Sequence, residues 1–334
     1  MRRHIHIVIV VVLLIVTYSI IQNPLSHRYI ETLKGTSQPV SNQKVHPDKL
    51  LEQIKTYASK RNELPINARI DPVWKAIPGY NGILVDVDAS YDRMKKKGKF
   101  DLSLIVYKQT SPEVTLNDLP PAPIFRGNPN KPMVTFLINV AWGNEYLPGM
   151  LETLKEHKIH VTFFLDGSWV RKNQEMAKII YEEGHEIGNH AYSHPDMRTL
   201  TNGRIEEEIR KTNEMIESTL NVTPAWFAPP SGSWTNNVVN VAASLKMKTI
   251  LWSVDTIDWR KPDPEQMANR IIDNIHPGAV VLMHPTVSTE KALDQMIKGV
   301  QEKGYSIGTV SQLMNEKRVI RSDTKVDFDK KLSK

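Results

Sequence analysis

Short runs of apolar residues alternate with longer amphipathic segments through the second half of the chain, from Met133 onward. A continuous apolar run is typical of a strand buried in a parallel sheet, and an amphipathic segment is typical of a helix that covers such a sheet. The apolar runs are MVTFLINV (133–140), HVTFF (160–164), EIGN (186–189), AWFAPP (225–230), KTILWSV (248–254), AVVLMH (279–284) and YSIGTV (305–310). About seven strand–helix units over roughly 185 residues predict a parallel α/β barrel rather than an open sheet.

The pattern before Met133 predicts a smaller α/β region at residues 46–115. HPDKLLEQIKTYASKR (46–61) has helical spacing, whereas GILVDVDA (82–89) and FDLSLIVYKQ (100–109) are typical of strands. Asp86 and Asp88 alternate along the first of these strands, which favours surface positions over a cation site. The remaining divisions that we expect are a proline-rich linker (116–132), the barrel domain (133–316) and a charged tail (317–334).

The N-terminus predicts a membrane anchor. MRRH precedes an apolar run of 17 residues from Ile5 to Ile21, a length at the short end of what spans a bilayer. No small-x-small cleavage motif follows, so we expect residues 1–22 to be an uncleaved signal anchor and residues 23–45 to be a flexible stalk. A cleaved signal peptide, and hence a secreted protein, is the alternative. Both interpretations place the rest of the chain on the extracytoplasmic face of the cell membrane, because positive residues before an apolar run stay in the cytoplasm.

Composition narrows the classes of function. Lys and Arg exceed Asp and Glu by 43 − 37 = 6, and no basic stripe is interleaved with aromatic residues, so we expect no binding to nucleic acid. The densest basic run, KKKGK (95–99), is interpreted as a solvated turn, with contact to an anionic polymer or membrane as the alternative. The chain has no cysteine, which excludes disulfides and thiolate metal ligands.

Polar and aromatic clusters follow five of the predicted strands. In an α/β barrel the functional residues lie where the strands end. His190 and His194 are four residues apart, so their imidazoles can lie on one side of a helical turn and bind one metal ion, although an isolated HxxxH is more often a loop or surface pair. The coincidence of all five clusters with strand ends favours a functional site. The clusters are INVAWGN (138–144), GNHAYSH (188–194), FAPPSGSW (227–234), VDTIDW (254–259) and LMH (282–284).

These motifs resemble those of the NodB-type polysaccharide deacetylases, carbohydrate esterase family four. The resemblance spans about Met133 to Met314 and is most specific in GHEIGNHAYSHPDM (184–197), in Pro229–Gly232 and in DTIDW (255–259). It implies a distorted (β/α)7 barrel that removes acetyl groups from N-acetylated sugars of peptidoglycan or chitin-like polymers. It also implies a divalent metal, usually zinc, held by one Asp and two His, with a second Asp as base and a His as acid.

The resemblance assigns roles to individual residues. His190 and His194 match the two metal histidines, and His284 matches the general acid. Asp258 matches the carboxylate that orients this acid, and a carboxylate beside an imidazole favours its cationic form. An ordinary buried hydrogen-bonded pair is the alternative interpretation of Asp258 and His284. Four further residues are expected to contact substrate: Tyr192, Pro230, Trp234 and Trp259.

Three residues depart from the family pattern. The motif T-F-D-D-G aligns with Leu137–Ala141, so the base position is Asn139 and the third metal-ligand position is Val140. The Arg that pairs with the base is replaced by Ala228. An amide cannot accept the proton of a metal-bound water, and valine cannot coordinate a metal. Losing the acid and its Arg partner together avoids an unpaired buried charge, so these substitutions are interpreted as a matched neutralisation.

Three hypotheses follow from these departures. The first is an extracytoplasmic member of the family that has lost or nearly lost catalysis, with no cofactor or weakly bound zinc, and that still binds cell-wall polysaccharide. The second is an active metal-dependent N-deacetylase with rearranged ligands drawn from His284, Asp255 or Glu145. The third is a structural protein whose sugar groove is vestigial. Aromatic residues beside the strand ends, including Trp142 and Trp226, could stack on sugar rings or pack in the core.

Overall fold

The computed structural model describes residues 11–13, 15, 17–19, 23–24 and 48–318. The predicted signal anchor and stalk lie largely outside these described residues, as does the tail beyond Arg318. Within the described part of the chain, no helix is both long enough and apolar enough to cross a membrane.

A parallel sheet of eight strands forms the centre of the larger domain. Its hydrogen-bonded order is β10-β11-β5-β6-β7-β8-β9, and β12 pairs with the first residues of β5. All eight residues of β5 are buried, which explains the continuous apolar run in its sequence. The parallel α/β barrel that the sequence predicted is confirmed as a curled parallel half-barrel. The strands are β5 (Met133–Val140), β6 (Thr162–Leu165), β7 (Glu186–Asn189), β8 (Trp226–Phe227), β9 (Lys248–Thr249), β10 (Val254–Asp255), β11 (Val280–Met283) and β12 (Ser306–Gly308).

Amphipathic helices follow the strands and cover the sheet. In α8, residues on one face are buried at helical spacing, among them Ile205, Ile209 and Ile216. Thr201 caps this helix at its N-terminus, and Asn221 ends it in a left-handed conformation. The helices are α5 (Leu147–Glu156), α6 (Gly167–Lys172), α7 (Gln174–Glu182), α8 (Asn202–Leu220), α9 (Asn236–Ser244), α10 (Pro264–Asn274), α11 (Val287–Glu302) and α12 (Val310–Met314), with short 3-10 turns at η3 (Met197–Thr199), η4 (Pro230–Gly232) and η5 (Asp258–Arg260).

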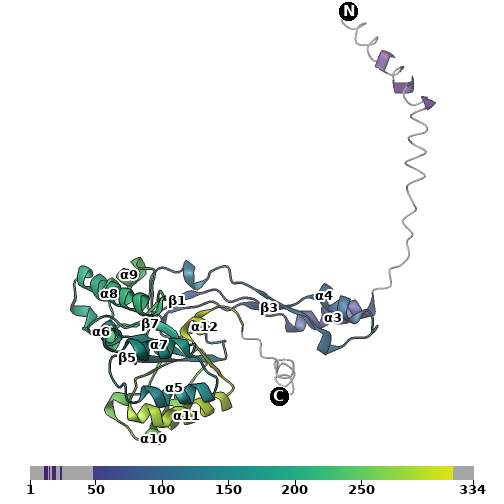
Figure 1. Cartoon of the computed structure of the whole chain (residues 1–334). Coiled ribbons are helices and arrows are strands. Elements are labelled where there is room, and N and C mark those ends of the chain that lie inside the picture. The colour runs from purple at the N-terminus through teal and green to yellow at the C-terminus, as the bar shows by residue number, and fades with distance from the viewer. Residues whose placement is uncertain (1–10, 14, 16, 20–22, 25–47, 319–334) are drawn as a thin grey trace, which may run out of the picture.

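The smaller region contains two helices and two antiparallel strand pairs. Its cluster of buried apolar residues includes Leu50, Ile54 and Met94. Its elements are α3 (Lys49–Arg61), β1 (Arg69–Asp71), β2 (Lys75–Ile77), β3 (Gly82–Val85), α4 (Val87–Met94), η1 (Leu102–Leu104), β4 (Tyr107–Thr110) and η2 (Leu116–Asp118). Figure 1 shows an elongated molecule, with α3 and α4 at the end opposite the half-barrel and extended segments between them.

The predicted strands of this smaller region are only partly correct. GILVDVDA forms β3 as far as Val85 and then enters α4, because the side chain of Asp86 caps this helix by accepting the Ala89 N–H. Asp88 therefore lies in the first turn of a helix and not on a strand. The second predicted strand begins with η1, and β4 starts only at Tyr107.

The proline-rich segment joins the half-barrel rather than passing beside it. Ile124 forms a parallel bridge with Ile250, directly after β9, and Arg126 forms an antiparallel bridge with Ala279, directly before β11. The N–H of Leu251 donates to the carbonyl of Ile124 at 2.7 Å. These bonds attach residues 124–126 to the chain directly after β9, an edge strand, and directly before β11, the neighbour of the other edge strand β10.

The segment after α12 fastens the smaller region to the half-barrel. Arg318 forms an ion pair with Glu63 at 2.6 Å, and its Nε donates to the carbonyl of Asn81 at 2.6 Å. On the barrel side, the buried Lys131 donates to the carbonyls of Gln312 and Asn315. Residues 315–318 are therefore a defined contact between the two parts.

Candidate active site

The ends of the strands surround a cavity of about 480 Å³ in the half-barrel. Its lining includes residues from all five clusters that the sequence places at strand ends. The lining residues are Asn139, Ala141, Trp142, His190, His194, Ser231, Trp252, Asp255, Trp259, Leu282 and His284.

The two histidines of the HxxxH motif lie together, but in a loop after β7 and not on the helical turn that the sequence suggested. Ala191 and His194 both have positive φ, and the imidazole centroids of His190 and His194 are 5.2 Å apart. The Nδ1 of His190 lies 2.7 Å from the carbonyl of Ala228 and must carry the proton, which leaves Nε2 as a free lone pair. Burial, followed by repulsion from His194 and His284, lowers the pKa of His190 to about 3, so its imidazole is neutral.

A buried glutamate that sequence reasoning missed holds this loop. Glu208 of α8 accepts the backbone N–H groups of Tyr192 and Ser193 at 3.0 and 2.8 Å, and also the Ser193 hydroxyl at 2.9 Å. The sequence did contain a signal that Glu208 is buried and paired, because it lies on the apolar face of α8 between Ile205 and Ile209. A charged residue on such a face needs a polar partner.

The two departures at the end of β5 lie on opposite faces of the strand. Asn139 lines the cavity and is 3 % exposed, and its Oδ1 is buried without a hydrogen-bond partner among the described residues. Val140 is fully buried in the apolar cluster that includes Leu147 and Met150 of α5. Ala228 is also fully buried. No ionisable group therefore occupies any of the three positions.

His284, directly after β11, forms a hydrogen-bonded pair with the buried Asp258 beside the end of β5. Asp258 accepts His284 Nδ1 at 2.8 Å, the backbone N–H of His284 at 2.6 Å and the Thr289 hydroxyl at 2.8 Å. Burial raises the pKa of Asp258, but the hydrogen bond and charge of His284, its backbone N–H and Thr289 together lower it below its usual value. The pair thus keeps the geometry of an oriented acid, while its role stays a prediction.

Three tryptophans provide the aromatic surface of the cavity. The ring of Trp142 stacks on His284, with centroids 6.0 Å apart and an interplanar angle of 9°. Trp142 is 47 % exposed and Trp259 is 54 % exposed, so both rings are available to a ligand. Trp252, which sequence reasoning missed, is the third. Its position near the end of the apolar run KTILWSV (248–254) was the signal.

The other residues expected to contact substrate are not in the cavity lining. Tyr192 faces Lys211, whose Nζ is 5.8 Å from the ring centroid, and Trp234 packs edge-on against Phe125 at 6.2 Å. Pro230 is buried, although its neighbour Ser231 lines the cavity. Their predicted contacts with substrate stay predictions. Trp226 is 6 % exposed and donates to Ser311, so it belongs to the core.

The residues present do not fit a catalytic zinc ion. Among the residues that the structure describes, no group of three or more His, Cys, Asp or Glu side chains could hold a metal. Of the alternative ligands, Asp255 lines the cavity, whereas Glu145 is exposed outside its lining. Asp166 caps α6 by accepting the Trp169 N–H through Oδ1, and it is not in the cavity lining. Its Oδ2 is buried without a partner among the described residues, and its N–H donates to the Val140 carbonyl. Burial raises the pKa of Asp166, which disfavours the charged form that a metal would need.

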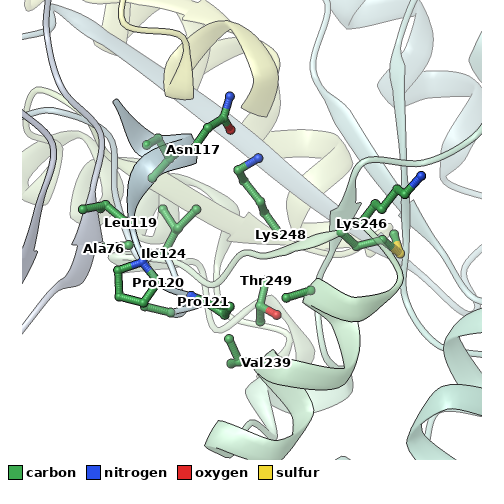
Figure 2. A pocket seen from close by; sticks show the side chains of 14 residues that line it. Ala76, Asn117, Leu119, Pro120, Pro121, Ile124, Val239, Lys246, Lys248 and Thr249 are labelled. Carbon is green, nitrogen blue, oxygen red and sulfur yellow. The ribbon is translucent and has the colours of Figure 1, made fainter. Parts of the chain in front are cut away.

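A second cavity, of about 340 Å³, shares no lining residue with the first. Figure 2 shows Pro120, Pro121 and Ile124 lining one part of it and Val239, Lys248 and Thr249 lining another. It contains no histidine or carboxylate.

Comparison with known sequences finds relatives among the polysaccharide deacetylases. A sequence model described as polysaccharide deacetylase matches residues 126–250. YlxY of Bacillus subtilis is 50% identical over 309 residues, which cover 92% of this chain and 96% of YlxY. Peptidoglycan-N-acetylmuramic acid deacetylase PdaA of B. subtilis is 31% identical over 201 residues, which cover 58% of this chain and 76% of PdaA.

Comparison with solved structures gives a more specific likeness. The crystal structure of BA3943, a CE4 family pseudoenzyme from Bacillus anthracis, superposes with a TM-score of 0.77 at 52% identity. The match covers 81% of this chain and 96% of that chain. A BA3943 mutant described as having restored enzymatic activity matches with the same TM-score at 51% identity, over 81% of this chain and 99% of that chain.

Proposed function

This chain belongs to the polysaccharide deacetylase family, and from that premise we propose that it binds N-acetylated cell-wall glycan, of the peptidoglycan type, without hydrolysing it. Its named relatives act on peptidoglycan, and BA3943 is described as a pseudoenzyme. The observation that carries the proposal is the loss of both carboxylates at the end of β5.

The chemistry of deacetylation depends on those carboxylates. A general base contributes typically 10²- to 10⁴-fold to a rate, and the Asn139 amide cannot serve as one. A catalytic zinc site normally has three protein ligands and one open position, whereas His190 and His194 supply two neutral donors. Without a firmly held metal there is no Lewis acid to polarise the acetyl carbonyl. We propose that the protein has no resident metal or only weakly bound zinc.

The neutral residues also suit a stable, non-catalytic cavity. Removing one member of a buried ion pair costs about 3–5 kcal/mol, whereas replacing both members with neutral groups can be nearly neutral. Asn139 and Ala228 fit the second case, since both are buried and neither is charged. Trp142 and Trp259 retain exposed rings beside the cavity, and such rings can stack on sugars.

The location that we propose is the extracytoplasmic face of the cell membrane, with the chain attached through its N-terminal segment or secreted. This follows from the apolar run at Ile5–Ile21 and its preceding positive charges. The cell-wall substrates of the named relatives are consistent with such a location.

Three measurements on the unmodified protein test the proposal. They are zinc content per chain, acetate release from chitooligosaccharides, and binding to isolated cell wall. We expect wall binding with less than stoichiometric zinc and no acetate release. Stoichiometric zinc with acetate release would support the alternative of an active N-deacetylase with rearranged ligands, for which Asp255 in the cavity is the candidate. Absence of all three would support a purely structural role.

A further inference from the structure

The unpaired amide of Asn139 is the feature of the cavity that the loss of catalysis does not explain. Its Oδ1 is buried, and no described residue donates to it. Leaving a buried acceptor without a partner costs about 1–3 kcal/mol, and an apolar residue of the same shape would avoid this cost. A chain that had simply lost its base has no physical reason to keep a polar side chain there.

From this we infer that Asn139 is a recognition residue that forms hydrogen bonds to the acetamido group of an N-acetylated sugar. The inference rests on the proposed function, and it names the chemical group of the glycan that the cavity recognises. A carboxamide offers one acceptor and two donors, and a secondary acetamide offers one N–H and one carbonyl. Asn139 can therefore accept the acetamide N–H through Oδ1 and donate to its carbonyl through Nδ2, whereas an ionised aspartate could only accept.

The surroundings of Asn139 fit the remainder of an acetamido group. Ala141 and Leu282 line the same cavity and provide apolar contacts for the acetyl methyl group. The strand register pairs Ile138 with Met283, so Asn139 of β5 and His284, the residue directly after β11, follow side by side. The Trp142 ring that covers His284 then forms a wall close to Asn139.

A free amino sugar would fit this cavity less well. Its ammonium group has no carbonyl to accept from Asn139 Nδ2 and no methyl group to contact Ala141 and Leu282. A buried ammonium also needs a carboxylate partner. The lining offers one carboxylate, Asp255, and its Oδ1 accepts the Ile257 N–H at 2.8 Å, so only Oδ2 remains for an ammonium. The protein would thus distinguish acetylated from deacetylated stretches of the same glycan.

The test is calorimetric binding of two oligosaccharides, tetra-N-acetylchitotetraose and its fully deacetylated tetramer, to the wild-type protein and two variants. We expect the wild type to prefer the acetylated tetramer at least about tenfold, because a site built to pair with a polar group discriminates against its absence. Asn139→Leu should weaken binding of the acetylated tetramer about tenfold and abolish the preference. Asn240→Leu, the same substitution at an exposed position of α9 outside the cavity lining, is the control and should keep the preference.

Thermal unfolding of the same variants separates recognition from folding. Because Asn139 Oδ1 has no partner in the free protein, Asn139→Leu should leave the Tm unchanged or raise it while binding is lost. Equal binding of both tetramers by the wild type, or an unchanged preference in Asn139→Leu, would overturn the inference while leaving glycan binding intact. Failure of the wild type to bind either tetramer or cell wall would overturn both the inference and the proposed function.

Discussion

His284 and Asp258 are joined by two hydrogen bonds, one from the ring and one from the backbone. The Nδ1 of His284 lies 2.8 Å from Oδ1 of Asp258, and the His284 N–H donates to Oδ2 at 2.6 Å. The pair predicted to be the acid side of the site is therefore hydrogen-bonded and ionisable, although Asn139, at the predicted base position, is neutral. A structural reason can account for this difference, because Asp258 also accepts the Thr289 hydroxyl of α11 and thus connects two loops to a helix.

Replacing this carboxylate should destabilise the fold whether or not the protein is an enzyme. Asp258→Asn leaves three donors without a charged acceptor, so we expect the free energy of unfolding to fall by about 3 kcal/mol. Urea denaturation followed by circular dichroism measures this. Asp196→Asn is a suitable control, because Asp196 lies at the surface and pairs with Arg198, and it should have a much smaller effect. Equal effects of the two variants would contradict a structural role for the pair.

Restoring the missing groups should restore metal binding. The triple variant Asn139→Asp, Val140→Asp and Ala228→Arg supplies a base, a third ligand and the partner of the base. We expect it to bind zinc, which equilibrium dialysis measures, and to release acetate at a low rate. Val140→Asp alone should raise zinc affinity without much turnover, because the base is still absent. A triple variant that binds no more zinc than the wild type would show that residues 137–141 are misaligned with the family motif.

Because Val140 is buried, the stability of the triple variant should depend on zinc. Without zinc, a carboxylate at this last residue of β5 has the apolar cluster of Leu147 and Met150 as its neighbours; to bind zinc it must turn toward His190 and His194. The metal-free triple variant should therefore be less stable than the wild type. Zinc binds the folded state and should reverse this, adding about 2.7 kcal/mol when its concentration is 100 times Kd. Unfolding with zinc and with a chelator measures the difference. The wild type should show no comparable shift.

Periodicity predicted the half-barrel because the apolar runs in its sequence coincide with strands that are buried in the folded domain. The run MVTFLINV is apolar except for Thr135 and Asn139 because β5 is buried on both faces. The smaller region was harder to predict. Its residues 82–89 alternate as in a strand, but the side chain of Asp86 caps a helix that begins at Val87. Periodicity also could not reveal that residues 124–126 form bridges directly after β9 and directly before β11, since these bridges depend on tertiary structure.

The residues of the site were predictable from their motifs, but their local conformation was not. Motif positions brought His190, His194 and His284 together around one cavity. Spacing alone suggested a helical turn for the two nearest histidines, whereas left-handed residues Ala191 and His194 place them in a loop. The loop depends on Glu208, which is distant in sequence, and only its place on an apolar helix face signals its role.

A buried imidazole at the opposite end of the strands should make the fold sensitive to acid. His185 is 4 % exposed, and its Nδ1 accepts the Val161 N–H at 3.2 Å. Burial, followed by repulsion from His160, lowers its pKa from 6.5 to about 4, against a smaller opposing effect of Glu183. Between pH 6.5 and pH 4, His185 binds a proton in the unfolded chain but not in the folded chain. Stability should therefore fall as the pH drops from 6.5 to 4, by up to about 3 kcal/mol.

His185→Gln tests this, because glutamine can accept the same N–H and does not titrate. We expect the variant to lose less stability than the wild type between pH 6.5 and pH 4, as measured by urea denaturation. His157→Gln, which removes an imidazole that pairs with Asp294, should retain the slope due to His185. Identical pH dependence of His185→Gln and the wild type would contradict the assignment.

Arg318 should contribute to stability far more than its place near the end of the described chain suggests. Its guanidinium pairs with Glu63, donates to the Asn81 carbonyl and lies 4.5 Å from the centroid of the Tyr80 ring. We expect Arg318→Ala to reduce the free energy of unfolding by about 2 kcal/mol and to speed proteolysis between the two parts. Lys317→Ala is the matched control, because the neighbouring Lys317 is exposed. Similar effects of both substitutions would contradict the role of Arg318.

Gly143 should be required for the contact between Trp142 and His284. It has φ +83, and a Cβ at this position would lie 2.1 Å from the carbonyl oxygen of Pro285, the residue after His284. Gly143→Ala must therefore move the Trp142 loop away from the loop that carries His284. We expect a loss of about 2 kcal/mol in stability together with weaker glycan binding and altered tryptophan fluorescence.

A second glycine distinguishes the effect of the left-handed backbone at Gly143 from the effect of its close contact with Pro285. Gly98 has φ +63, but a Cβ there would meet nothing within 4 Å. Gly98→Ala therefore carries the backbone strain without the clash, and it should lower stability less and leave glycan binding unchanged. If the two variants bind glycan equally well, the close approach of Gly143 to Pro285 does not position Trp142. If only Gly143→Ala binds weakly, the stacked Trp142 ring is part of the sugar-binding surface.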